Sequence, residues 1–385
     1  MKRILIAWVY HGAFGHLVEA IEAANNYKTA NPDCSVSVIL CKAGSSDLVR
    51  YCPWIDTSYQ IDCDQNLEPQ LRQIPSEWDH VVYPVRLGNR PELWYGANLL
   101  EANHRLQRHL RARLGSQYDD GKLISGCALP CAGHARIRMK LPDSSLAWAS
   151  EFRDSKASPV ISVLLNGSAP FSGFPSIRTW RALLCRIAEE FPDASFLLTG
   201  LSVKSRFGFR LAQSRNRQIE KLSRDVPRLK YCFDVGLEKQ LALIASSDIF
   251  LAPHTGFSFL APSLGTPWLA LSGSYWGDCT AGDTPFYFSV PKCECYPCYG
   301  NRKSLCKLRD LVHIPVPCVN ELLLSRYQDV AAGIRHLMDS GFDLQKSFET
   351  YRQLAIRQGV NVRELWRIGD YFSQKESLAN ASEAR

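Results

Sequence analysis

The sequence predicts an α/β protein of two domains, each built on a parallel sheet covered by helices. The chain has 385 residues, of which 46% are hydrophobic, so it can fill two ordinary cores. Apolar, strand-like runs alternate with stretches at helical spacing, which is the pattern of β-α-β units. This alternation starts afresh near residue 159, after a polar, irregular stretch at 140–158 that we expect to link the domains. Two such domains are expected to face each other across a cleft.

The first domain is expected to span residues 1–150. An apolar strand at 2–9 leads through a glycine-containing turn at 11–16 into a helix at 17–29. Two further strands and a helix with proline near its first turn follow, at 35–40, 80–85 and 91–114 respectively.

The second domain is expected to span residues 158–340 and to repeat the same plan. Its predicted strands lie at 159–165, 195–199, 249–252 and 268–271, and its predicted helices at 178–190, 258–263 and 328–340. Residues 341–375 are expected to form closing helices. The tail at 376–385 lacks apolar residues and is expected to be disordered.

Charge and hydropathy argue against several classes of protein. The net charge of +7 is modest for this length, and the basic stretch at 105–113 (RLQRHLRAR) is typical of a solvated helix face. No nucleic-acid-binding motif accompanies it. No apolar run approaches the roughly 18 residues of a membrane span. The basic, apolar start lacks a small-residue cleavage site, so we expect a cytoplasmic protein that starts at Met1.

The chain contains 14 cysteines, and they fall into two groups. Those before residue 240 are dispersed and are expected to be small buried hydrophobic residues. The later ones cluster in a loop at 279–318, where the spacing Cys293-x-Cys295-x2-Cys298-x7-Cys306-x11-Cys318 suits a closed, tetrahedral thiolate site. We expect Cys295, Cys298, Cys306 and Cys318 to bind a structural metal, with Cys293 left over and Cys279 as a further candidate. The alternative is a set of reduced, unpaired thiols.

The strongest chemical motif lies in segment 248–274, DIFLAPHTGFSFLAPSLGTPWLALSGS. A buried strand ends at Pro253, and His254, Thr255 and Gly256 turn the chain into a helix. Free N–H groups and the positive dipole end at a helix start suit a pyrophosphate. Thr255 can cap the helix or donate to a phosphate oxygen, and Gly256 lets a ligand approach closely.

This segment resembles glycosyltransferase family 9, which includes the lipopolysaccharide heptosyltransferases. The resemblance rests on His254-Thr255-Gly256, Phe259-Leu260-Ala261, Gly265-Thr266-Pro267 and Ser272-Gly273, and upstream on Gly236-Leu237-Glu238, Asn166-Gly167-Ser168 and Arg178-Thr179-Trp180. It covers most of residues 158–335 and is weaker in the first domain. It implies the GT-B fold and inverting transfer of a heptose-like or related sugar from a nucleoside-diphosphate sugar to a hydroxyl, without a catalytic metal.

The resemblance also implies roles for individual residues. Donor binding is expected from Asn166, Ser168, Arg178, His254, Thr255 and Gly256, with Arg178 as a phosphate clamp. His16 stands where the family has the carboxylate that deprotonates the acceptor; a histidine can do this work, and His11 and Glu19 are alternatives. His254 and Phe259 replace an acidic residue and a histidine of the family.

The cysteine loop resembles the iron-binding finger of autotransporter heptosyltransferases, which implies iron as well as zinc for the metal. A finger of this kind can also be an assembly surface for a homo-oligomer. The expected acceptor is a hydroxyl of a glycan, a protein or a small molecule. Two other functions stay open: a nucleotide-sugar 2-epimerase with the same architecture, and a catalytically inactive nucleotide- or sugar-binding relative.

Overall fold

The computed structural model describes residues 1–7, 14–41, 46–62, 65–82, 112, 118–119, 137–167, 174–202, 209–253, 255–271, 286–287 and 321–343. These residues divide into two compact units, an N-terminal unit up to Lys140 and a C-terminal unit from Leu141 on. The predicted helix at 91–114 (apart from residue 112), the predicted closing helices from residue 344 on, the tail and nearly all of the cysteine loop lie outside the described residues. Among the described helices, none combines the length and the apolar content that crossing a membrane needs.

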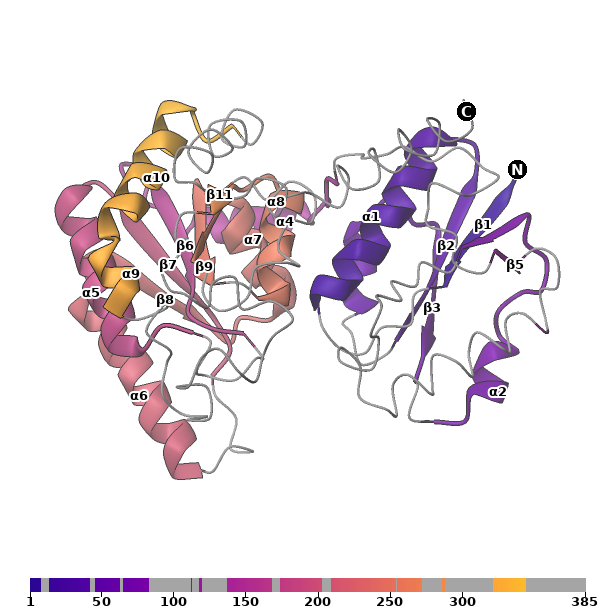
Figure 1. Ribbon diagram of the computed structural model, residues 1–385, viewed down its shortest axis with the longest axis horizontal. Helices are drawn as coiled ribbons and strands as arrows, with labels where there is room; N and C mark the ends of the chain where they lie inside the picture. The colour runs from indigo at the N-terminus through magenta and orange to yellow at the C-terminus, as the bar shows by residue number, and fades with distance from the viewer. Residues whose placement is uncertain are drawn as a thin grey trace, which may run out of the picture. The chain divides into compact units, whose positions relative to one another are not determined.

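The N-terminal unit contains a parallel sheet with the strand order β3-β2-β1-β4-β5 (Figure 1). The apolar side chains of its central strand, from Ile4 to Ala7, are buried on both faces, as in sheets covered by crossover helices. The elements are β1 (Arg3–Ala7), α1 (Phe14–Ala30), β2 (Ser35–Cys41), η1 (Ser46–Tyr51), β3 (Thr57–Ile61), α2 (Leu67–Leu71), β4 (His80–Val82) and β5 (Tyr118–Asp119).

Helix α1 begins three residues earlier than predicted, at Phe14 instead of residue 17. The prediction assigned Gly15 and His16 to the preceding turn. A glycine costs a helix about 1 kcal/mol relative to alanine, and burial of apolar residues such as Leu17, Val18 and Ile21 along α1 offsets that cost. His16 therefore lies in the first turn of α1, and not in the loop before it.

The C-terminal unit contains a six-stranded parallel sheet with the order β11-β10-β9-β6-β7-β8. Its strands are β6 (Val160–Leu164), β7 (Ser195–Gly200), β8 (Leu229–Phe233), β9 (Ile249–Pro253), β10 (Trp268–Leu271) and β11 (Phe286–Tyr287). Figure 1 shows α5 (Ile177–Glu190), α6 (Phe209–Asp225), α9 (Glu321–Ser325) and α10 (Tyr327–Asp339) on one side of this sheet, and α4 (Asp143–Ser150), α7 (Leu237–Ala245) and α8 (Leu260–Ser263) on the other. Both faces are thus covered, which explains why every residue of β6 and β9 is buried.

The stretch expected to be an irregular link contains helix α4, which packs on α7. Two side-chain contacts join these helices: buried Ser145 of α4 donates a hydrogen bond to the Glu238 carboxylate of α7, and Lys239 Nζ of α7 lies 4.6 Å from the centre of the Trp148 ring of α4. Ala149 joins the buried cluster beneath α7. The segment therefore belongs to the C-terminal unit.

Candidate functional site

The C-terminal sheet reverses its winding between β6 and β9. From β6 the chain moves outward to β7 and β8, whereas β9, on the other side of β6, leads to β10 and β11. In open parallel sheets, ligands bind beyond the carboxyl ends of the strands at such a switch point. The register of β6 with β9 ends at Val163–Leu251, and each strand then runs on into a loop. These two loops carry all of the predicted donor-binding residues except Arg178, which lies in α5.

The two loops touch at Gly167 and Thr255. A Cβ at Gly167 would lie 2.8 Å from both Cβ and Cγ2 of Thr255, which is far inside normal carbon–carbon contact. The ring of buried Phe174 lies nearby, 3.7 Å from the same position. Glycine therefore allows this close approach. Gly167 is part of a motif recognised in the sequence, but the motif alone predicts no role for it.

The Thr255 hydroxyl is bonded within its own turn. Thr255 Oγ1 accepts a hydrogen bond from the Ser258 N–H at 3.2 Å and lies 2.9 Å from Ser258 Oγ. Ser258 Oγ donates its own proton to the Pro253 carbonyl at 2.9 Å, so Thr255 must supply the proton between the two hydroxyls. Two roles are predicted for Thr255, and it fills the first of them: it caps the short helix η7 (Gly256–Phe259). The proton needed for a phosphate oxygen is already engaged.

Helix α5 begins at this edge of the sheet, with Arg178 in its first turn. Ser176 caps the helix by accepting a hydrogen bond from the Thr179 N–H at 3.1 Å. Arg178, in the first turn, is exposed, and half-buried Asn166 lies two residues after the end of β6. Neither side chain makes a hydrogen bond or an ion pair with another described residue. A free guanidinium beside the positive end of a helix dipole is suited to bind an anion.

The N-terminal sheet has a switch point of its own, between β1 and β4. Helix α1 follows β1, and its first turn places the backbone of His16 at the carboxyl edge of this sheet. The His16 side chain and the whole of His11 lie outside the described residues. The same holds for Ser168, His254, Cys295, Cys298, Cys306 and Cys318, so their predicted roles stay predictions. Among the described residues there is no cluster of metal-ligating side chains.

Phe259, for which the resemblance to family 9 implies a histidine, is a core residue here. Its ring packs edge-on against Trp268 with the centroids 5.4 Å apart, and it is 8% exposed. Gly256, by contrast, is half-buried at the start of η7. The turn thus offers backbone and small side chains at the sheet edge, with an aromatic layer beneath it.

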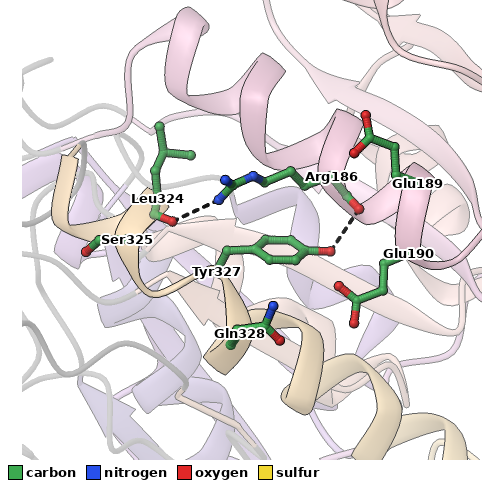
Figure 2. Close-up of a pocket in the computed structure, with 7 residues that line it drawn as sticks. All are labelled: Arg186, Glu189, Glu190, Leu324, Ser325, Tyr327 and Gln328. Carbon is green, nitrogen blue, oxygen red and sulfur yellow. Dashed lines mark hydrogen bonds between the residues drawn. The ribbon is translucent and has the colours of Figure 1, made fainter.

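The hollow shown in Figure 2 lies elsewhere. It has a volume of about 410 Å³ and is lined by Arg186, Glu189, Glu190, Leu324, Ser325, Tyr327 and Gln328. Arg186 is nine residues along α5 from its start, roughly 14 Å away at 1.5 Å per residue. The Arg186 side chain donates to the Leu324 carbonyl at 3.1 Å, and the Tyr327 hydroxyl donates to the Arg186 carbonyl at 2.8 Å. We interpret this region as a junction between α5 and the last described helices.

The described cysteines of the dispersed group agree in part with the prediction. Cys34, Cys52 and Cys232 are buried, while Cys185 is half-buried. Burial raises the pKa of Cys52 to about 12 and that of Cys232 to about 11. These thiols are therefore protonated and unreactive near neutral pH.

Two parallel α/β sheets in one chain, each with its own switch point, are the architecture of the GT-B class of fold. No protein-family model and no curated protein match the sequence. Among solved structures, the chain is similar in fold to the glycosyl transferase family 9 protein of Veillonella parvula, at 13% identity, with a TM-score of 0.52, over 86% of this chain and 97% of that chain.

Two E. coli structures match with lower TM-scores. ADP-heptose LPS heptosyltransferase II is 15% identical over 81% of this chain and 98% of that chain, with a TM-score of 0.49. The iron-containing dodecameric glycosyltransferase TibC is 14% identical over 88% of this chain and 81% of that chain, with a TM-score of 0.48. At these identities the likeness concerns the fold alone.

Proposed function

We propose that the protein is a glycosyltransferase that moves a sugar from a nucleoside-diphosphate sugar to an acceptor hydroxyl with inversion, and without a catalytic metal. The observation that carries this proposal is the meeting of two predicted donor loops at the switch point, where Gly167 and Thr255 touch. The GT-B fold, shared with a family 9 glycosyltransferase, supports it. A heptose or related sugar is the proposed donor group, and a hydroxyl on a glycan, a protein or a small molecule the proposed acceptor.

The diphosphate would bind between the two loops. Arg178 and the N-terminus of α5 supply positive potential there, which stabilises the charge that develops on the departing nucleoside diphosphate. Asn166 supplies an amide that can donate or accept. Because the Thr255 hydroxyl proton is engaged, we assign Thr255 the role of holding the turn, with Gly256 as the residue whose backbone the diphosphate approaches.

The acceptor hydroxyl would lose its proton to a histidine of the N-terminal unit. His16 is the first candidate because its backbone lies in the first turn of α1, beyond the carboxyl end of β1; His11 is the second. An imidazole titrates near neutrality and can accept this proton as the anomeric carbon is attacked. The cysteines Cys295, Cys298, Cys306 and Cys318 would hold iron or zinc as a structural, closed site, in a chain that can form homo-oligomers.

The test of donor binding compares Arg178→Ala with Arg181→Ala. Arg181 lies one turn further along α5, is also exposed, and pairs with Asp225 at 3.0 Å, so it controls for loss of a positive charge on the same helix. Hydrogen bonds to charged groups contribute about 1.5–3 kcal/mol, so Arg178→Ala should weaken nucleoside-diphosphate binding roughly 10- to 150-fold. Calorimetric titration should give Arg181→Ala the affinity of the wild type within about threefold. Equal affinity for all three proteins would remove Arg178 from the site.

Product analysis separates the proposed transfer from the other functions of this fold. A transferase given a sugar nucleotide and an acceptor releases nucleoside diphosphate and forms a glycoside. A 2-epimerase yields a new sugar nucleotide with no free diphosphate, and an inactive relative leaves the donor unchanged. Mass spectrometry detects the glycoside and the free diphosphate. Proton NMR of the sugar nucleotide separates a 2-epimer, which has the same mass as the donor, from unchanged donor, and either of the last two outcomes would contradict the proposal.

A further inference from the structure

We infer that two buried tryptophans, Trp180 and Trp268, are positioning residues that hold the two donor loops at the distance that diphosphate binding requires. This inference rests on the proposed function, since it assigns the loops of the same site. Each indole N–H donates to a backbone carbonyl near the carboxyl end of a switch-point strand: Trp180 to Leu165 at 3.1 Å, and Trp268 to Ala252 at 3.1 Å.

Trp180 connects α5 with the end of β6. It is fully buried and lies two residues after Arg178, while the carbonyl that it binds belongs to Leu165, the residue directly before Asn166. One hydrogen bond therefore fixes the spacing between the proposed phosphate clamp and the strand-end amide. Leu165 is itself buried, at 1% exposure, so water does not compete for its carbonyl.

Trp268 supports the second loop. It opens β10 and is fully buried, and its indole reaches across to the Ala252 carbonyl in β9, two residues before His254. Its ring also packs edge-on against Phe259 of η7. The same side chain thus contacts the chain before and after the turn that contains Thr255.

The sheet ladder does not connect the two loops at this point. The register pairs of β6 with β9 stop at Val163–Leu251, before Leu165 and Ala252 are reached. Trp180 approaches from α5, on one side of the sheet, while Trp268 packs against η7, which leads into α8 on the other side (Figure 1). Together the indoles hold the ends of β6 and β9. In the loops that follow these strands, Gly167 and Thr255 are in close contact.

The variants Trp180→Phe and Trp268→Phe remove the N–H while keeping an aromatic ring in each core. Trp54→Phe is the matched control, because the buried Trp54 indole donates to the Ile21 carbonyl at 3.0 Å in the N-terminal unit. Each change removes one buried hydrogen bond from an indole N–H to a backbone carbonyl, so all three should lower the midpoint of chemical denaturation. A loss of packing alone would affect all three proteins alike.

The deciding experiment measures the dissociation constants of ADP, UDP and GDP by calorimetry, at a temperature where every variant is folded. For the nucleotide that the wild type binds, we expect Trp180→Phe and Trp268→Phe to raise the dissociation constant by about tenfold or more, since small displacements of binding groups have large effects. Trp54→Phe should bind within about twofold of the wild type.

Two results would overturn the inference. If Trp180→Phe and Trp268→Phe bind the nucleotide as tightly as the wild type, or if Trp54→Phe loses as much affinity as they do, the tryptophans act on the fold alone. A wild type that binds none of the three nucleotides contradicts the proposed function itself, and this inference with it.

Discussion

Replacing Gly167 with alanine places a methyl carbon 2.8 Å from two carbons of Thr255. Favourable carbon–carbon contacts lie at about 3.5–4.0 Å, so one loop must move by about 0.7–1.2 Å to accept the methyl group. The backbone of Gly167 is not in the left-handed region, and alanine therefore adds no backbone strain. The effect of Gly167→Ala thus reports the contact between the loops.

The size of the expected loss in stability depends on how firmly Thr255 is held in place. Thr255 is 7% exposed and is held by hydrogen bonds to Ser258, which is in turn bonded to Pro253. Overpacking a well-packed site costs about 1–3 kcal/mol, and the lower chain entropy of alanine returns about 0.4–1 kcal/mol. We expect a net loss of about 1–2 kcal/mol, or roughly 2–8 °C in the melting temperature of a domain of this size.

The assay is a double-mutant cycle with Thr255→Gly, in which chemical denaturation measures the free energy of unfolding. Thr255→Gly removes both Cβ and Cγ2, so adding Gly167→Ala to it should cost at least about 1 kcal/mol less than in the wild type. Additivity within about 0.5 kcal/mol would show that these loops do not meet. In the single variant Gly167→Ala, nucleoside-diphosphate affinity should fall together with stability, because the loop displacement is at the proposed site.

Three further predictions concern other parts of the chain. His16→Ala should leave the donor dissociation constant unchanged and abolish sugar transfer in a product assay; a fully active variant would remove His16 as the base. Cys298→Ser should lower bound iron or zinc, measured by elemental analysis, and lower the melting temperature, and an unaltered metal content would end the proposed metal site. Burial raises the pKa of Tyr327 to about 12 from its usual value near 10, so the folded state favours the protonated phenol and its contribution is complete below about pH 10. The stability gap between wild type and Tyr327→Phe should then shrink as the pH rises from about 10 to 12, and a gap independent of pH would contradict this assignment.

Much of the fold is predictable because the decisive patterns are local. The bounds predicted for β10 agree with the structure at both ends, and α5 differs by one residue at its start. Buried parallel strands are short apolar runs, and their helices carry apolar residues at a regular spacing. The two donor loops follow directly from these elements, since they are the connections at strand ends.

Three elements that are not predicted from the sequence lack this signal. Strand β8 is at the sheet edge, where Lys230 and Tyr231 are exposed and only Cys232 is buried, so no continuous apolar run marks it. The long, charged α6 buries Ile219 and Leu222 among polar residues. Helix α4 appears as a polar linker because its stability comes from contacts with α7.

The contacts that build the candidate site are beyond sequence reasoning for a similar reason. The approach of Gly167 to Thr255 joins residues 88 positions apart, and the Trp268 indole bonds a carbonyl in the neighbouring strand. Local patterns place each residue on an element but do not give distances between elements. The engagement of the Thr255 proton likewise appears only once the positions of Ser258 and Pro253 are known.

Amide hydrogen exchange of the wild type, with and without a nucleoside diphosphate that it binds, tests the central claim most directly. If the diphosphate binds at the switch point of the C-terminal sheet, peptides that contain Asn166, Arg178 and Thr255 should exchange more slowly in its presence. Peptides that line the hollow of Figure 2, near Arg186 and Tyr327, should not change. Protection at that hollow, with none at the two loops, would contradict the account.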